Sequence, residues 1–189
     1  MLELSLHILD IVQNSIVAGA DLIEIEIEED RGRDYLLISI RDNGRGIPKE
    51  DLLRVTDPFY TSRETRRVGL GLSLLQQAAL QCDGDLEVKS GQDRGTEVKA
   101  YFKHSHIDRM PLGDMAKTMS ILIGANPQID FCYHHRLEGD EFKLDARLLR
   151  ENLDGVPLND HNVIAFILQE VGEWMERRNC RLREDRDEA

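Results

Sequence analysis

Asp42-Asn43-Gly44-Arg45-Gly46-Ile47 is the most informative stretch of this chain, and it follows the apolar run Tyr35-Leu36-Leu37-Ile38-Ser39-Ile40. The apolar run has the composition of a buried strand, which would carry the carboxylate of Asp42 to the end of a sheet. The two glycines then let the backbone turn tightly and approach a ligand closely. Because such a stretch also makes ordinary turns, its interpretation depends on three others in a set order. They are Asp10-Ile11-Val12-Gln13-Asn14, Asp57-Pro58-Phe59-Tyr60-Thr61-Ser62 and Gly69-Leu70-Gly71-Leu72.

The composition fits one large soluble domain, or one domain with a small extension. The chain has 189 residues, of which 41% are hydrophobic and 32% charged. Its formal net charge of -12 would repel nucleic acid and anionic lipid, so we predict no nucleic-acid partner and no membrane insertion. Any bound anion would need a local site. Cys82, Cys132 and Cys180 lack paired spacing, which indicates a reducing compartment, and we predict the cytoplasm.

Hydrophobic periodicity and turn residues predict helices and strands along the whole chain. Up to residue 104 the prediction is a helix over 4–18, strands over 21–28 and 35–41, a short helix after Pro48, a helix over 71–81, and strands over 85–90 and 96–104. Beyond it, the prediction is a helix to about residue 124, a hairpin of 129–137 and 141–145, and a final helix from about residue 157. We therefore predict a main domain (1–104), a small α+β extension (105–178) and a charged, frayed tail (179–189).

The predicted first helix carries His7, Asp10 and Asn14, which return to one face at about 3.6 residues per turn. A carboxylate and a carboxamide one turn apart can hold a hydrated magnesium ion and orient a water molecule. The alternative is a surface helix with polar residues on its solvent side. The other stretches favour the magnesium site, because they add places for a base and for phosphates.

Adenine recognition is one use of the residues around Asp42. Its carboxylate could accept a hydrogen bond from an exocyclic amine, while Gly44 and Gly46 leave room for a ring. The alternative is a hairpin turn. Gly95-Thr96 starts the last strand of the unit, where a hydroxyl could bond a buried carboxylate or a water beside the base. A plain turn is the alternative there.

Phosphate binding is suggested by Gly69-Leu70-Gly71-Leu72, which opens a helix. The first N–H groups of a helix and its dipole favour phosphate oxygens, and glycines allow close approach. Arg63, Arg66 and Arg67 precede this stretch and could add charge-assisted contacts. The alternative is a flexible loop with solvated arginines.

Together these stretches resemble the Bergerat ATP-binding fold (the GHKL family), which gyrase, heat-shock chaperones, histidine kinases and mismatch-repair ATPases share. The resemblance covers residues 1–104 and involves five elements in order. They are residues 10–20 for the N box, 42–48 for the first glycine box, 57–61 for the F box of histidine kinases, 68–74 for the second glycine box, and Gly95-Thr96 for the last. The implied fold is α+β, a two-layer α/β sandwich whose mixed sheet is covered on one face by helices.

The resemblance implies ATP and Mg²⁺ as cofactors. Asn14 would coordinate the magnesium ion, Asp42 would read adenine, and Asp10 would be the catalytic carboxylate. The other residues implied in nucleotide binding are Gly44, Gly46, Ile47, Phe59, Thr61, Gly69, Leu70, Gly71, Leu72 and Thr96. Gly44 and Gly46 would border the base, and Gly69 and Gly71 would lie along the phosphates under a mobile lid.

The sequence departs from the family pattern in three places. Asp10 stands where ATP-hydrolysing and serine-kinase relatives usually have glutamate, and its side chain is shorter by one methylene. Arg67 takes the place of an earlier glycine in the second glycine box. No helical hairpin with a phosphoacceptor histidine precedes the N-box helix, so we expect a kinase catalytic domain without its usual substrate domain.

Three functions are compatible with these features. A stand-alone regulatory protein kinase would transfer the terminal phosphate of ATP to an unidentified protein partner, and the F box and the small size favour it. An ATPase switch would order residues 60–69 on binding and change a protein interface. A non-catalytic sensor would bind the nucleotide without turnover. A homodimer is left open as a further partner.

Histidines in the second half raise the alternative of a metal site. His104-Ser105-His106 and Cys132-Tyr133-His134-His135 bring several possible ligands close together in the sequence. They form no closed four-ligand pattern, so we predict packed or solvated histidines rather than a metal site.

Overall fold

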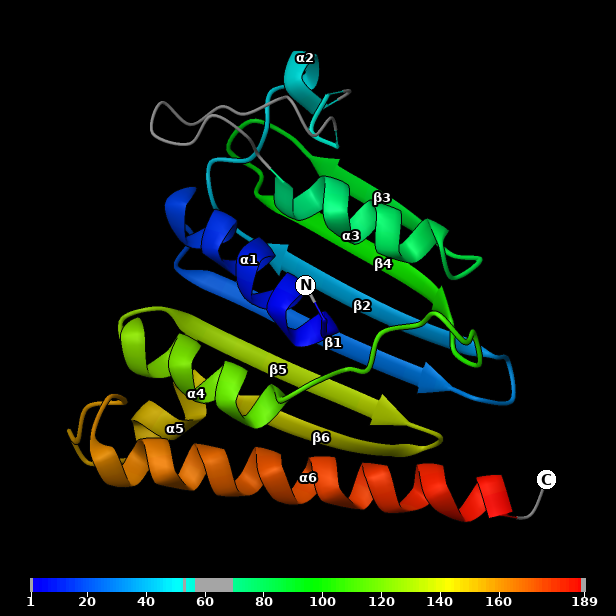
Figure 1. The fold of residues 1–189 in the computed structure, drawn as a ribbon. Coiled ribbons are helices and arrows are strands. Elements are labelled where there is room, and N and C mark those ends of the chain that lie inside the picture. The colour runs from blue at the N-terminus through cyan, green and yellow to red at the C-terminus, as the bar shows by residue number, and fades with distance from the viewer. Residues whose placement is uncertain (1, 53, 57–69, 188–189) are drawn as a thin grey trace.

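The computed structural model describes residues 2–52, 54–56 and 70–187, which build one six-stranded sheet (Figure 1). The strands lie in the order β3-β4-β2-β1-β5-β6. Their bounds are β1 Leu22–Asp30, β2 Tyr35–Asp42, β3 Asp85–Ser90, β4 Thr96–Lys103, β5 Asp130–Leu137 and β6 Asp140–Asp145. Strands β1 and β5 run parallel and the other neighbours run antiparallel, so the sheet is mixed.

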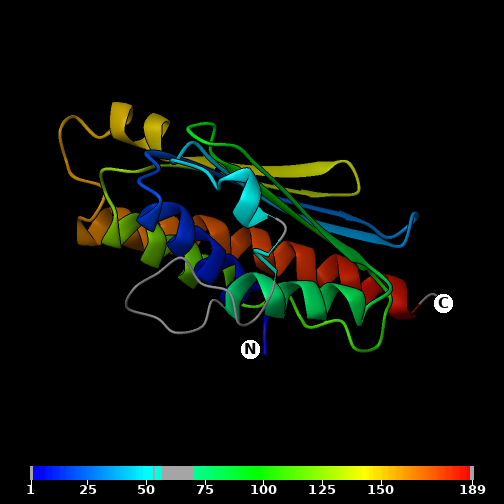
Figure 2. The same ribbon diagram turned by 90° about the horizontal axis from the view of Figure 1, so that it is seen from above.

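Helices α1, α3, α4 and α6 lie on one face of this sheet (Figures 1 and 2). The helices are α1 Leu4–Val17, α2 Lys49–Leu52, α3 Leu70–Leu80, α4 Met115–Ala125, α5 Ala146–Asn152 and α6 His161–Asp187. The predicted α+β fold with a two-layer arrangement is confirmed, although the sequence analysis does not predict α5. None of the helices in the described ranges is both long enough and apolar enough to span a membrane.

Strand β1 shows how the sequence builds the core. Its isoleucines, Ile23, Ile25 and Ile27, are buried under the helices, while the alternating glutamates point to the opposite face. Ile25 pairs with Ile40 of β2 and Ile27 pairs with Ile38, so the two strands present one continuous apolar surface to the helical layer.

The segment after residue 104 continues the same sheet and core. Strand β5 pairs with β1 along its length, and β6 forms the edge of the sheet beyond it. Ile8 of α1 and Ile167 of α6 belong to one hydrophobic cluster. The division at residue 104 stays a prediction, but residues on both sides of it share one sheet. Helix α6 continues to Asp187, through much of the segment 179–189 for which the sequence predicts a frayed tail.

A buried ionic cluster joins four elements at the end of β1. The Glu29 side chain is fully buried and accepts a hydrogen bond of 3.0 Å from His104 Nε2, just after β4, and one of 2.9 Å from His135 Nε2 on β5. Arg178 of α6 donates to both carboxylate oxygens through Nε and Nη2. The Tyr133 hydroxyl lies 3.0 Å from His135 Nδ1. Helix α6 is thereby tied to the middle of the sheet.

The protonation states in this cluster follow from its partners. Burial alone would raise the pKa of Glu29, but the hydrogen bonds from His104, His135 and Arg178 outweigh it and hold the pKa far below the ordinary carboxyl value. Burial lowers the pKa of His135, so its neutral ring donates from Nε2 to Glu29 and accepts at Nδ1 from Tyr133. A lowered carboxyl pKa contributes stability that is present above the ordinary carboxyl range and is lost as the pH falls through the folded-state value.

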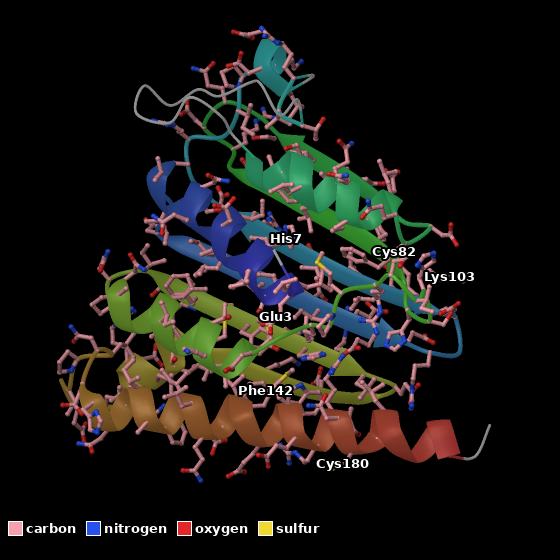
Figure 3. All side chains as sticks on the ribbon, in the orientation of Figure 1. Glu3, His7, Cys82, Lys103, Phe142 and Cys180 are labelled. Atoms are coloured by element: carbon pink, nitrogen blue, oxygen red, sulfur yellow. The ribbon has the colours of Figure 1, made fainter. Side chains whose placement is uncertain are left out.

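Aromatic packing also holds helix α6 against the sheet, one turn before Arg178. The ring of Trp174 stacks on Phe142 of β6 with centroids 5.9 Å apart, and it meets the edge of His135 at 5.5 Å. Phe142 is labelled on the strand beside α6 in Figure 3. The second half of α6 is therefore held by stacked rings as well as by the Arg178–Glu29 ion pair.

The substitution Glu29→Gln should destabilise the protein strongly, because Arg178 would keep its buried charge and lose the opposite one. We expect the free energy of unfolding to fall by about 3–5 kcal/mol in urea denaturation. The control is Glu24→Gln on the same strand, whose side chain is 48% exposed and lies 3.9 Å from Arg41. That variant should change stability by less than about 1 kcal/mol. Equal effects of the two variants would contradict the role of Glu29 as the buried counter-ion of Arg178.

Candidate functional site

The carboxylate of Asp42 is fixed at the end of β2 by three donors from three parts of the chain. Ser15 Oγ of α1 donates to Oδ2 at 2.7 Å, and the backbone N–H groups of Gly44 and Thr96 donate to Oδ1 at 2.9 and 3.2 Å. The residue is only 8% exposed. Since each carboxylate oxygen accepts about two hydrogen bonds, Oδ2 retains capacity for one more donor.

The glycines after Asp42 are required by the packing of their own loop. A Cβ on Gly46, whose φ is +69°, would lie 2.0 Å from the carbonyl oxygen of Gly91 in the β3–β4 turn. A Cβ on Gly44 would lie 3.0 Å from Ala18, just after α1. The Arg45 N–H also donates to the Ala18 carbonyl at 3.1 Å. The predicted contact of these glycines with a base stays a prediction, and chain packing alone already explains why glycine is needed.

Ser90 at the end of β3 joins two predicted site residues, Ile47 and Thr96, and the neighbouring Gly95. Its Oγ accepts from the Ile47 N–H at 2.8 Å, donates to the Gly95 carbonyl at 2.8 Å, and lies 2.9 Å from Thr96 Oγ1. The hydroxyl of Thr96 therefore faces Ser90, while its backbone N–H is the group that bonds Asp42. The loop over residues 44–47 is held to the strand ends by these contacts.

Helices α1 and α3 approach each other closely at Gly71. A Cβ on Gly71 would lie 1.9 Å from Asp10 Oδ2 and 3.8 Å from Asn14 Nδ2. The missing side chain thus leaves the space that the Asp10 carboxylate fills. The structure therefore brings the predicted magnesium ligand and the predicted catalytic carboxylate to the first turn of α3, where the sequence predicts phosphates.

His7 lies one turn before Asp10 on α1, within the helical layer (Figure 3). It is 3% exposed, and its Nδ1 has no hydrogen-bond partner among the described residues. Burial lowers the pKa of His7, and the nearby Asp10 acts in the opposite direction. His7 shares the helix face predicted for Asp10 and Asn14, but it is more deeply buried than either.

Part of the predicted site lies outside the described residues. This is true of Phe59, Thr61 and Gly69, and also of the three arginines Arg63, Arg66 and Arg67. Leu70 begins α3, and Leu72 packs partly buried against the core. The roles predicted for all these residues stay predictions.

Three histidines of the second half, His104, His134 and His135, are engaged by carboxylates. His104 and His135 bond Glu29, and His134 Nε2 lies 2.9 Å from Glu141. Within the described ranges, no three or more histidine, cysteine or acidic side chains are grouped so as to hold a metal ion.

The sequence analysis gives no role to Ser15 or Ser90. The sequence pattern could have identified Ser15, because this residue continues the buried stripe of Ile8 and Ile11 on α1. A polar residue on an apolar stripe requires a buried partner, and that partner is Asp42. No comparable pattern marks Ser90, which ends an alternating strand.

The sequence profile of the "Histidine kinase-, DNA gyrase B-, and HSP90-like ATPase" family matches residues 2–106 of this chain. The match covers more than half of the 189 residues and includes both groups of side chains described above. The chain therefore belongs to this family of ATP-binding domains, and the recognition made from the sequence is confirmed.

Several bacterial proteins are similar to part of the chain. The "Non-motile and phage-resistance protein" of Caulobacter vibrioides is 33% identical over 54% of this chain and 13% of its own length. In Bacillus subtilis, "Sensor histidine kinase YxdK" is 31% identical (49% of this chain, 30% of the relative) and "Sporulation kinase C" is 30% identical (47% and 20%). The chain thus spans less than a third of the length of each of these relatives.

A solved structure shows the same fold. The "Crystal Structure of N terminal domain of a DNA repair protein" aligns with 77% of this chain and 53% of that chain, with a TM-score of 0.52. The sequence identity is 19%, so the likeness concerns the fold alone.

The substitution Gly71→Ala should lower stability, because its Cβ would overlap the Asp10 carboxylate and displace it from the first turn of α3. We expect a loss of about 1–2 kcal/mol in thermal or urea unfolding. The matched control is Gly172→Ala in α6, where a Cβ meets nothing within 4 Å. That change should raise stability by about 0.5–1 kcal/mol, since alanine favours helix over glycine. If both variants are stabilised alike, the close contact at Gly71 is wrong.

Proposed function

We propose that this protein binds Mg-ATP between α1, α3 and the β2–β4 end of the sheet, and transfers the terminal phosphate to a partner protein. One observation carries the proposal. Ser15 of helix α1 donates a hydrogen bond to Asp42. The adjacent residue of the same helix, Asn14, lies beside the first turn of α3. A base-reading group and a phosphate-facing group are therefore fixed to a single helix.

The adenine end fits the chemistry of an exocyclic amine. Asp42 is an acceptor held in one orientation by Ser15, Gly44 and Thr96, and Oδ2 has capacity for one further donor. Because the carboxylate is nearly buried, a bound amine would be shielded from water, which strengthens its hydrogen bond. This arrangement supports the predicted role of Asp42 as the residue that selects adenine.

The phosphate end fits a hydrated magnesium ion with its triphosphate. Asp10 and Asn14 offer oxygen ligands of the kind that Mg²⁺ prefers, and the N-terminus of α3 favours negative charge. Mg-ATP, when bound, supplies the phosphoryl group that is transferred. Asn14 would hold the ion, and Asp10 would accept the proton of the attacking hydroxyl at a carboxylate oxygen.

The likeness to sensor histidine kinases supports a protein as the phosphate acceptor. The net charge of -12 supports a partner other than nucleic acid. The cysteines are free, with Cys82 buried and Cys180 exposed, which supports the cytoplasm as the compartment. Residues 105–178 are proposed as an extension that completes the sheet of the ATP-binding domain.

The substitution Asp42→Ala should weaken the binding of ATP and magnesium by about 10- to 100-fold in calorimetric titration, which is roughly 1.5–3 kcal/mol. The reason is the loss of the acceptor for the amine. Glu87→Ala on β3 is the control, since this exposed residue lies outside the site. Circular dichroism would verify that both variants are folded. Unchanged affinity in Asp42→Ala would remove the adenine role.

Phosphate transfer is tested with labelled ATP and candidate acceptor proteins. We expect label on the acceptor with the wild-type protein and none with Asp10→Ala, because the proton of the acceptor group would have no base. Steady release of inorganic phosphate without a labelled protein would instead indicate an ATPase.

A further inference from the structure

Strand β6 forms one edge of the sheet, and a cleft lies beside it. Among the described strands β6 pairs with β5 alone, which leaves its outer main-chain groups available to a further strand. The cleft has a volume of about 770 Å³ and lies between the β5–β6 hairpin and helix α6. Its lining includes Gly139, Asp140 and Glu141 from the hairpin, and Trp174, Arg177 and Arg181 from the helix.

Helix α6 forms the floor beside this edge. Figure 1 shows α6 running along β6 at the outer edge of the sheet, and Figure 2 shows it in the layer of the other helices. Phe166, Glu173 and Arg177 are seven and four residues apart, so they lie on one face of the helix, and all three are exposed. Glu173 and Arg177 line the cleft. A strand added to β6 would therefore cover this face, including the ring of Phe166, which is 46% exposed.

A second copy of this chain fits the edge of β6 poorly. Paired strands lie about 4.8 Å apart, and the copy would bring its own α6 into the space beside the first α6. A single extended segment carries no helical layer, so it can approach β6 and rest on α6. The shape of the edge therefore favours one strand of another protein.

The charges around the cleft favour a basic segment. Three pairs of opposite charge are already formed there, and they are Arg178–Glu29, Arg181–Asp140 and Lys143–Glu141. Glu173 and Glu176 remain on α6 without an ion pair among the described residues, against Arg177 alone. The formal net charge of the whole chain, -12, adds to the attraction of a cation.

We propose that β6 and the exposed face of α6 bind an extended, basic segment of a partner protein, which pairs with β6 as a seventh strand. This inference goes beyond the proposed function and does not depend on it. Main-chain hydrogen bonds hold the segment, and its alternate side chains cover Phe166 and meet Glu173 and Glu176. The charged side chains of Glu141 and Lys143 disfavour an uncharged strand, which makes the pairing selective.

The test uses the fluorescence of Trp174, because it lines the cleft and is the single tryptophan of the chain. The probe is a nine-residue peptide of alternating valine and lysine, with acetylated and amidated ends. Titration into the full chain should give a saturable change in emission. Glutamate in place of lysine should weaken binding by about fivefold or more, because like charges would then face each other. N-methylation of alternate amides should abolish binding, because it removes main-chain donors.

Two variants of the protein locate the peptide. Glu173→Lys reverses a charge on the floor of the cleft and should weaken the lysine peptide by about fivefold. The matched control is Glu87→Lys on β3, the opposite edge of the sheet, which should bind the peptide as the wild type does. Circular dichroism would verify that both variants are folded.

Several results would overturn the proposal. They are no saturable change up to about 1 mM of the lysine peptide, equal binding of the glutamate or N-methylated peptide, and weakening by Glu87→Lys but not by Glu173→Lys. A dimer of the protein that protects residues 140–145 from hydrogen exchange would also overturn it, since a second copy would then cover the edge. ATP binding, measured by calorimetry on the same samples, tests the proposed function separately.

Discussion

The hydrogen bond from Ser15 to Asp42 is the contact on which the arrangement of the site depends. It joins helix α1 to the end of β2 at 2.7 Å in a place where both side chains are buried. A buried carboxylate without donors would be costly, so α1 cannot rotate or slide without a penalty. Because Asp10 and Asn14 lie on the same helix, their positions beside α3 are set by the same contact.

The cluster around Glu29 fixes the position of helix α6 at the other end of β1. Glu29 pairs with Leu36 in the sheet, whereas Ile23, near the start of β1, pairs with Asp42. One end of the β1–β2 pair thus holds the candidate nucleotide site, and the other holds the ionic contact to Arg178. Residues 105–187 therefore do more than extend the chain, since they supply two strands and the groups that neutralise a buried charge.

Much of this organisation could be predicted from local sequence. The alternation of isoleucine and glutamate in β1 predicted its buried face, and the glycine-rich stretches predicted where strands end and helices begin. The role of Glu29 could not be predicted, because its partners His135 and Arg178 lie 106 and 149 residues away. The role of Ser90 depends in part on the Ile47 N–H, which lies 43 residues away. The parallel pairing of β5 with β1 was equally inaccessible, since the local pattern of a strand carries no information about its neighbour.

The ionic cluster also bears on how the chain folds while it is being synthesised. Glu29 and Arg178 are separated by 149 residues, and Glu29 and His135 by 106. When only the first hundred residues of this chain have been synthesised, β1 lacks its neighbour β5, and Glu29 lacks its ion-pair partner Arg178. Such distant pairings are slow to form and leave strand edges exposed for longer. The buried carboxylate of Glu29 can therefore gain all of its partners only after residue 178 has been synthesised.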